Sequence, residues 1–138
     1  AGVSVRRRSR WYRSAPLPVS DQPWYVNGVA EVSSGLDPTR LLALMHRIEE
    51  EFGRRREVLN GARELDLDLL AYDEVVSAAG AVPLLPHPRL QQRAFVLLPL
   101  AELAPHWRHP KYGQDLETLI RALPGGQICE PIEDAVSE

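Results

Sequence analysis

Two aspartates, Asp66 and Asp68, alternate with leucines in the stretch 62–72. This period-two alternation predicts a strand with one apolar face, from which both carboxylates emerge on the other side. Like charges this close repel unless a cation balances them, and an all-oxygen pair suits Mg²⁺ beside substrate phosphates. Arg63 adds a fixed positive charge with bidentate geometry for phosphate. The stretch therefore predicts a phosphoryl-transfer site; an amphipathic strand with its polar face in water is the alternative.

Three further arginines, at positions 54–56, precede this strand. They follow a predicted helix that begins after the cap residue Asp37 and ends at Gly53. Basic residues at a helix end also complement the helix dipole, which is the simpler interpretation. Their position just before the aspartate strand favours a phosphate clamp.

Three residues elsewhere have side chains suited to ligand binding. Tyr25 and Asn27 share one face of a strand predicted over residues 24–32, where a ring and an amide can read a flat heterocycle. Packing of the tyrosine on a helix, with the asparagine at a bend, explains the same spacing. Prolines at 83, 86 and 88 hold His87 in an extended turn, as a phosphate ligand, a proton donor or a surface residue.

The remaining elements predict an α+β fold with helices on a mainly antiparallel sheet. A basic strand runs from Val3 to near Ser14, and a proline-rich loop follows over 14–23. Residues 90–103 predict a helix that Pro99 kinks or breaks, and 114–123 predict another. The acidic residues of 126–138 predict a loose tail.

Length and composition favour a single globular domain over residues 1–138. No run is long and apolar enough to span a membrane, and the one cysteine, Cys129, excludes an internal disulfide, so we expect a cytoplasmic monomer. Eleven of the 16 basic residues lie in residues 1–63, whereas twelve of the 19 acids follow. The basic half suits an anionic ligand.

Five ordered segments, taken together, resemble the 6-hydroxymethyl-7,8-dihydropterin pyrophosphokinase family. They are Y-R-S-A-P-L at 12–17, D-Q-P-W-Y-V-N at 21–27, R-I-E-E-E-F-G-R-R-R at 47–56, A-R-E-L-D-L-D-L-L at 62–70 and P-H-P-R-L-Q-Q-R-A-F-V-L-L-P-L-A-E-L-A-P at 86–105. The resemblance implies a ferredoxin-like core and a folate-pathway enzyme that transfers diphosphate from ATP to the pterin hydroxymethyl group, releasing AMP.

The resemblance also implies a role for each matching residue. Asp66 and Asp68 would hold two Mg²⁺ ions and, with Arg54 and Arg63, form the catalytic set. The residues implied to bind ATP are Arg54, Arg56, Arg63, His87 and Arg93. The residues implied to form the pterin pocket are Ser14, Leu17, Tyr25, Asn27 and Phe95, with Tyr25 and Phe95 sandwiching the ring.

Two departures from the family pattern stand out. Residues 59–63 read L-N-G-A-R where the family often has R-W-G-P-R, so the loop at 57–62 would cover ATP without the family's aromatic residue and extra arginine. The family also begins with a G-S-N strand and a helix that have no counterpart before Val3, which predicts an N-terminally incomplete domain, inactive by itself. The alternatives are an inactive or truncated relative and a noncatalytic module that binds RNA or another polyanion through the basic first strand.

Overall fold

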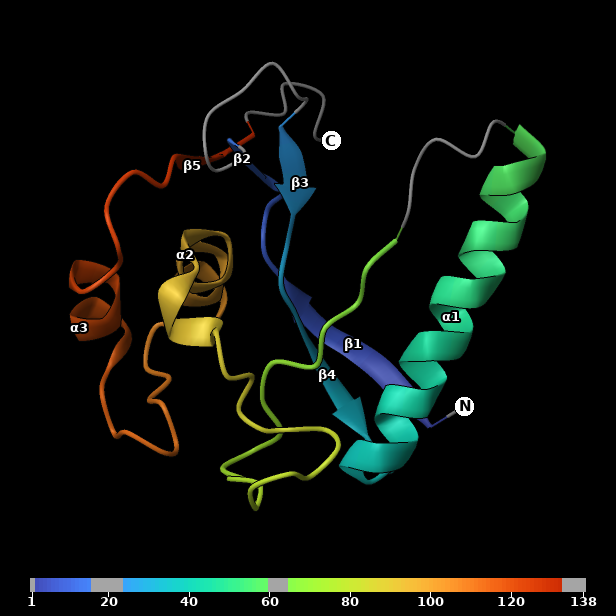
Figure 1. Ribbon diagram of the computed structural model, residues 1–138, viewed down its shortest axis with the longest axis horizontal. Coiled ribbons are helices and arrows are strands. Elements are labelled where there is room, and N and C mark those ends of the chain that lie inside the picture. The colour runs from blue at the N-terminus through green and yellow to red at the C-terminus, as the bar shows by residue number, and fades with distance from the viewer. Residues whose placement is uncertain (1, 16–23, 60–64, 133–138) are drawn as a thin grey trace. The chain divides into compact units, whose positions relative to one another are not determined.

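The computed structural model describes residues 2–15, 24–59 and 65–132, with only the backbone described for 54–59. Its helices and antiparallel sheets confirm the α+β class (Figure 1). The elements belong to two units, one built from residues 1–3 and 34–87 and the other from 4–33 and 88–138. The ferredoxin-like arrangement stays a prediction.

The second unit contains a three-stranded sheet in the order β3-β2-β5. The strands are β2 (Tyr12–Ser14), β3 (Tyr25–Asn27) and β5 (Cys129–Pro131), and β2 pairs antiparallel with both neighbours. Side chains alternate along a strand, so the two ends of β2 are buried on one face while Arg13 is exposed on the other. The prediction of a loose tail over 126–138 is wrong for β5. The strand was missed because three residues are too few to show the alternation that signals a strand.

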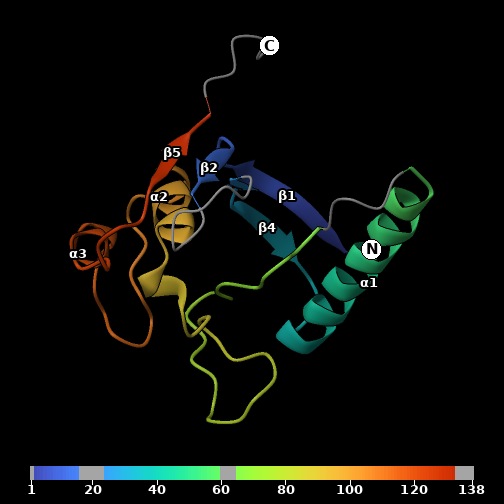
Figure 2. The ribbon, with the colours of Figure 1, turned by 45° about the horizontal axis from the view of Figure 1, so that its top comes forward.

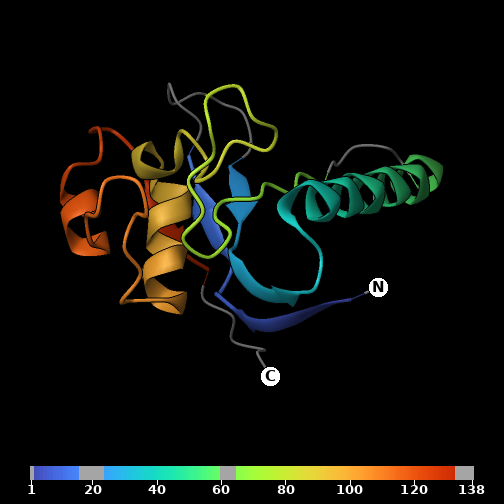
Figure 3. The same cartoon turned by 90° about the horizontal axis from the view of Figure 1, so that it is seen from below.

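Helix α2 (Ala94–Leu103) packs against β2 and β5, and Figure 3 shows it alongside them. A 3-10 turn, η1 (Leu90–Gln92), precedes it, so the helix predicted over 90–103 divides at Arg93. The helix continues through Pro99, which is buried. The predicted break at this proline is therefore wrong, and the alternative of a kink stays a prediction. The interruption lies six residues earlier, where Arg93 adopts an extended backbone.

A second helix of this unit, α3 (Leu116–Arg121), packs against α2. It confirms the helix predicted over 114–123, in shorter form. Its cap is Asp115, whose side chain accepts a hydrogen bond of 2.9 Å from the Thr118 backbone N–H. Hydrogen bonding by Thr118, first through its side chain and then through its backbone N–H, lowers the pKa of the Asp115 carboxyl, because it favours the charged form.

A separate two-stranded sheet pairs β1 (Val3–Arg8) with β4 (Ala30–Ser34), as Figure 2 shows. The predicted basic strand is confirmed over β1, whose residues are largely exposed. The strand predicted over 24–32 divides between β3 and β4 at Gly28. A Cβ atom at Gly28 would lie 3.2 Å from the ring of Trp11, a tight contact, so the close approach of that ring favours a glycine there.

The first unit contains one long helix and an irregular segment. Helix α1 (Pro38–Leu59) begins as predicted, because the Asp37 carboxylate accepts a 2.8 Å hydrogen bond from the Arg40 N–H. It does not end at Gly53. The favourable helix propensity of the R-R-R-E-V-L sequence that follows outweighs the roughly 1 kcal/mol cost of an interior glycine. Among the described residues, no helix is both long and apolar enough to cross a membrane.

Candidate active site

The aspartate segment, residues 65–70, is extended, but the described residues provide no ladder partner for it. The strand predicted over 62–72 is therefore wrong as an element within the described part, residues 65–72. Its face pattern is confirmed, since the leucines at 65, 67 and 69 are half-buried while Asp66 and Asp68 are exposed. An extended chain turns alternate side chains to opposite sides, with or without a neighbouring strand. Both carboxylates are therefore open to solvent.

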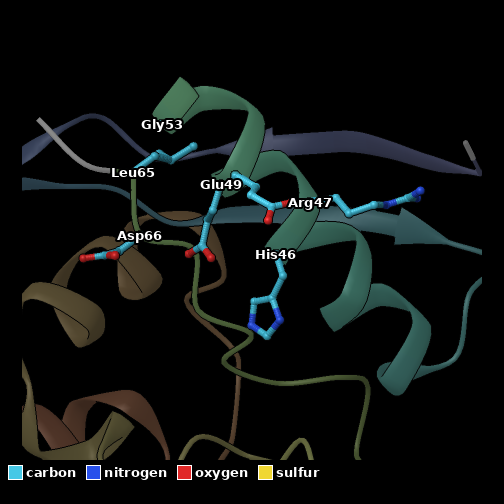
Figure 4. Close-up of a pocket in the computed structure, with 7 residues that line it drawn as sticks. His46, Arg47, Glu49, Gly53, Leu65 and Asp66 are labelled. Carbon is cyan, nitrogen blue, oxygen red and sulfur yellow. The ribbon is translucent and has the colours of Figure 1, made fainter. Parts of the chain in front are cut away.

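One side chain of α1 holds this segment. The Leu67 backbone N–H, which lies between the two aspartates, donates a 2.6 Å hydrogen bond to Glu49 Oε2. In Figure 4 the Glu49 side chain extends from α1 towards the chain that carries Leu65 and Asp66. The two elements line an open surface pocket of about 410 Å³. Its lining residues are His46, Arg47, Glu49, Glu50, Gly53, Leu65 and Asp66.

Glu49 is a site residue that sequence reasoning missed. One signal was available: it lies four residues after Met45, at the edge of the predicted apolar face of the helix. An acid at such an edge is half-buried and needs a hydrogen-bond donor. Which donor it finds cannot be read from spacing, because Leu67 is 18 residues away.

Another predicted residue of this unit, His87, lies beside the end of the aspartate segment. Its backbone N–H donates a 2.8 Å hydrogen bond to the Leu70 carbonyl oxygen. Two further hydrogen bonds support the extended turn predicted around it. The Ser77 N–H donates to the Leu85 carbonyl oxygen at 2.8 Å, and the Leu85 N–H donates to Ser77 Oγ at 2.9 Å. The structure thus brings His87 and the aspartates into the same unit.

The predicted phosphate-binding arginines are less fully described. Arg54 and Arg56 belong to α1, so the prediction that they follow the helix end is wrong. Their side chains lie outside the described residues, and so do Arg63 and the predicted pterin residue Leu17.

Three predicted pterin residues share one face of the β3-β2-β5 sheet. Ser14 pairs directly with Tyr25, and Tyr12 pairs with Asn27, and paired residues of neighbouring strands project to the same side. Ser14 is buried while the Tyr25 side chain is exposed. Ser14 Oγ and Asn27 Oδ1 are buried atoms with no hydrogen-bond partner among the described residues. Such groups are costly unless paired, so this face can offer a hydroxyl and an amide oxygen to a polar ligand.

Arg93 and Phe95 lie together at the start of α2. The Arg93 guanidinium carbon is 5.4 Å from the centre of the Phe95 ring, within the range of a cation–π interaction. Both side chains are half-buried. A cation and an aromatic face at one helix terminus can contact a phosphate and a planar ring from neighbouring positions.

A hydrogen-bonded group at the other end of α2 joins this helix to β2. Glu102 accepts hydrogen bonds from the Tyr12 hydroxyl at 2.8 Å, the Arg10 backbone N–H at 3.0 Å and Arg10 Nε at 3.2 Å. Burial disfavours ionised Glu102, but these bonds outweigh burial and lower its pKa. The pKa of Tyr12 is raised, first by burial and then by its bond to Glu102. The helix that carries Phe95 is thereby fixed against the strand that carries Ser14.

The predicted site residues therefore fall into two sets, each within its own unit. The first unit holds Asp66, Asp68 and His87; the second holds the residues Ser14, Tyr25, Asn27, Arg93 and Phe95.

Together these features define an α+β protein with a paired-carboxylate segment suited to phosphoryl transfer. The chain belongs to the 7,8-dihydro-6-hydroxymethylpterin-pyrophosphokinase family, whose family model matches residues 1–105. The resemblance read from the sequence is thus confirmed. Neither the family model nor the relatives named below support the alternative of an RNA-binding module.

Individual relatives agree with the family match. The chain is 44% identical over 121 residues to the 2-amino-4-hydroxy-6-hydroxymethyldihydropteridine pyrophosphokinase of Synechocystis sp., covering 87% of this chain and 60% of that protein. It is 45% identical over 113 residues to the protein of the same name from Pseudomonas aeruginosa, covering 82% and 68%. It is 37% identical over 127 residues to the folic acid synthesis protein fol1 of Schizosaccharomyces pombe, covering 92% and 17%. The chain therefore spans about 60% of the length of the Synechocystis relative.

Proposed function

We propose that this protein transfers diphosphate from ATP to the hydroxymethyl group of 6-hydroxymethyl-7,8-dihydropterin, releasing AMP, as a step of folate biosynthesis. The observation that carries the proposal is the family match over residues 1–105, which includes both aspartates and the pterin-side residues. The relatives named as pyrophosphokinases match the chain at 44% and 45% identity.

In this proposal Asp66 and Asp68 hold Mg²⁺, two ions with ATP. Their donor set fits, because two exposed carboxylates on one side of an extended segment offer only oxygen ligands and leave room for phosphates and water. No group of three histidine, cysteine or acidic side chains gathers in the described residues, so a protein cage of the zinc type finds no counterpart there. When bound, Mg²⁺ would neutralise phosphate charge and align the transferred group.

The basic residues would bind the triphosphate. Arg54, Arg63, His87 and Arg93, with Arg56 as a further contact, would offset the charge on the phosphate oxygens as the β-phosphorus is attacked. This chemistry needs alignment and charge neutralisation more than covalent participation by the protein. The guanidinium of Arg93, held over Phe95, has a defined orientation for that contact.

The pterin would bind against the sheet face of the second unit. Tyr25 and Phe95 would stack on the two faces of the bicycle, and Leu17 would pack at its edge. Ser14 Oγ and Asn27 Oδ1 would accept hydrogen bonds from the polar edge of the pterin, which supplies amino and ring N–H donors. Any water must leave these two buried oxygens when a ligand binds. A ligand that donates a hydrogen bond to each of them compensates for that loss, which favours its binding.

Product analysis tests the proposal. The full-length protein, incubated with Mg²⁺, ATP and 6-hydroxymethyl-7,8-dihydropterin, should form AMP and the pterin diphosphate in equal amounts. 6-Methyl-7,8-dihydropterin, which lacks the attacking hydroxyl, should give neither product. The proposal fails if no pterin diphosphate forms, or if AMP is released equally well with the methyl compound. Salt-sensitive RNA binding without turnover would instead establish the noncatalytic module.

A further inference from the structure

The start of α2 lacks a cap of its own. Arg93 occupies the N-cap position in an extended conformation, with φ −120° and ψ 114°. An arginine side chain has five donors and no acceptor, so it cannot bind the free N–H groups of the first helical turn. The Val96 and Leu97 N–H groups reach the Arg93 carbonyl oxygen at 3.0 Å, but the Ala94 N–H needs an acceptor from elsewhere.

That acceptor is the side chain of Gln127, 33 residues further along the chain. Its Oε1 accepts a 2.8 Å hydrogen bond from the Ala94 N–H. Its Nε2 donates to the Gln92 carbonyl oxygen at 2.9 Å and to the Pro124 carbonyl oxygen at 3.3 Å. One planar amide thus binds the residues immediately before and after Arg93. Both backbone neighbours of this arginine are fixed at once.

The backbone around Gln127 explains how the amide reaches this position. Gly126 has φ +88°, a conformation that side-chain-bearing residues rarely adopt, and it turns the chain after Pro124. Just beyond Gln127, the Ile128 carbonyl oxygen accepts a 3.0 Å hydrogen bond from the Ala15 N–H, and β5 then pairs with β2. Gln127 is therefore anchored to the same sheet that carries Ser14.

We propose that Gln127 is a positioning residue for Arg93 and Phe95. Its amide caps α2 from the sheet side and sets the orientation in which the arginine and the aromatic ring meet their ligands. The inference rests on the proposed function, because it assigns these two residues to ATP and the pterin. Gln127 lies outside residues 1–105, so the family match assigns it no role.

The test compares Gln127→Met with Gln114→Met in the full-length protein. The first change keeps the length of the side chain but removes every hydrogen bond of the amide. Gln114 is an exposed glutamine of the same unit whose side chain makes no hydrogen bond in the described structure, so its replacement controls for the loss of one amide. A third variant, Gln127→Glu, keeps an acceptor for the Ala94 N–H but loses the donor for the Gln92 oxygen.

The readouts are the KM values for pterin and MgATP, kcat, the pterin Kd from quenching of pterin fluorescence, and the melting temperature. Gln127→Met should raise the pterin Kd and both KM values by about tenfold, the effect expected for losing one to two net hydrogen bonds. Gln127→Glu should lie between this variant and the wild type, and Gln114→Met should match the wild type.

The outcomes separate the inference from the proposed function. A purely structural role would lower kcat in proportion to the folded fraction and leave KM and Kd unchanged, which would overturn the inference. Unchanged values in Gln127→Met would overturn it as well. A wild-type protein that binds the pterin but forms no pterin diphosphate would refute the proposed function, and the pterin Kd values would still decide the role of Gln127.

Discussion

The two regions that carry the candidate site residues are built in different ways. The aspartate segment, residues 65–70, is extended and unpaired within the described structure. Between its two carboxylates it is held by the one hydrogen bond that the Leu67 N–H donates to Glu49. The start of α2, residues 92–95, is held on both sides by the amide of Gln127 and is followed by a buried helix.

This difference matches the chemistry that each region is proposed to perform. Exposed carboxylates keep their water until a cation arrives, so Asp66 and Asp68 avoid the cost of buried, unpaired charge. Mg²⁺ suits such a site, because it retains several waters of its own. Phe95 and Arg93 are instead proposed to recognise shape and planar geometry, for which a preorganised backbone would reduce the entropy lost on binding. The properties of the aspartate segment thus depend mainly on hydration, and those of the start of α2 depend mainly on packing.

The largest effect should come from the aspartates. Asp66→Asn and Asp68→Asn each remove a charge that balances a cation at the transferring diphosphate, so turnover should fall by about a thousandfold or more. The melting temperature of the metal-free protein should stay level or rise slightly, since two carboxylates no longer repel each other. Steady-state kinetics and metal-free melting are measured on the same samples. If both mutants kept full Mg²⁺-dependent turnover, the two aspartates would only form a water-exposed polar face of the segment.

A smaller effect is expected from Glu49→Leu. The change leaves the Leu67 N–H without its charged acceptor and frees the backbone between the aspartates, a loss of about 1.5–3 kcal/mol that should lower turnover by roughly ten- to a hundredfold. The matched control is Glu50→Leu. Glu50 follows it in α1 and also lines the pocket, but it makes no bond to the segment.

MgATP titration by calorimetry separates the two possible origins of this effect. Weaker Mg²⁺-dependent binding in Glu49→Leu, with normal binding in Glu50→Leu, would support positioning of the aspartates. Equal losses in both variants would mean that pocket charge alone matters, and the contrast between the two regions would then lose its basis.

The sequence predicted the features that depend on neighbouring residues. The Asp37 cap, the alternation around Asp66 and the helix capped by Asp115 all follow from local chemistry within four residues. Features that need a distant partner were missed. Strand β5 has three residues and exists because β2 pairs with it, while the predicted strand over 62–72 has no described partner. At Gly53, the favourable helix propensity of the following residues outweighed a stop signal.

The candidate site shows the same limit. Asp66 and Asn27 were predicted as candidate ligand-binding residues from strand alternation and side-chain chemistry, whereas Phe95 was predicted only from the resemblance to the family. The supporting residues Glu49 and Gln127 were not predicted from the sequence. Each bonds to backbone 18 or more residues away, and a bond from a side chain to a distant backbone group leaves no periodic trace in a sequence.

Two tyrosines, one in each unit, allow the contrast between the units to be tested by stability measurements. Tyr12→Phe removes a 2.8 Å bond to the charged Glu102 in the second unit, which should cost about 1.5–2 kcal/mol of unfolding free energy. Tyr72→Phe removes a 2.6 Å bond to the neutral Leu36 carbonyl oxygen in the first unit, at a cost of about 1 kcal/mol. Urea unfolding of both variants gives the two values. A larger loss of unfolding free energy in Tyr72→Phe than in Tyr12→Phe would show that the hydrogen bond between Tyr12 and Glu102 is not the stronger of the two.

The smallest effect concerns pH and His109, a buried residue of the second unit. Its Nδ1 accepts hydrogen bonds of 3.2 Å from the Lys111 and Tyr112 backbone N–H groups, and its ring stacks on Tyr112 at 4.6 Å. A proton on Nδ1 would face two donors. Burial lowers the pKa of His109, and the charge of Lys111 lowers it further.

Because the folded protein has the lower pKa, the unfolded chain takes up the proton first as the pH falls. The stability from neutral His109 is therefore complete above the ordinary pKa of 6.5 and is lost as pH falls through the folded pKa. In His109→Asn the amide oxygen accepts the same N–H groups but does not titrate, so the unfolding free energy should vary less with pH below 6.5. Urea unfolding between about pH 5 and 8 measures this slope, with exposed His106→Asn as the control for losing one histidine. A His109→Asn slope as steep as that of the wild type would show that acid sensitivity arises elsewhere.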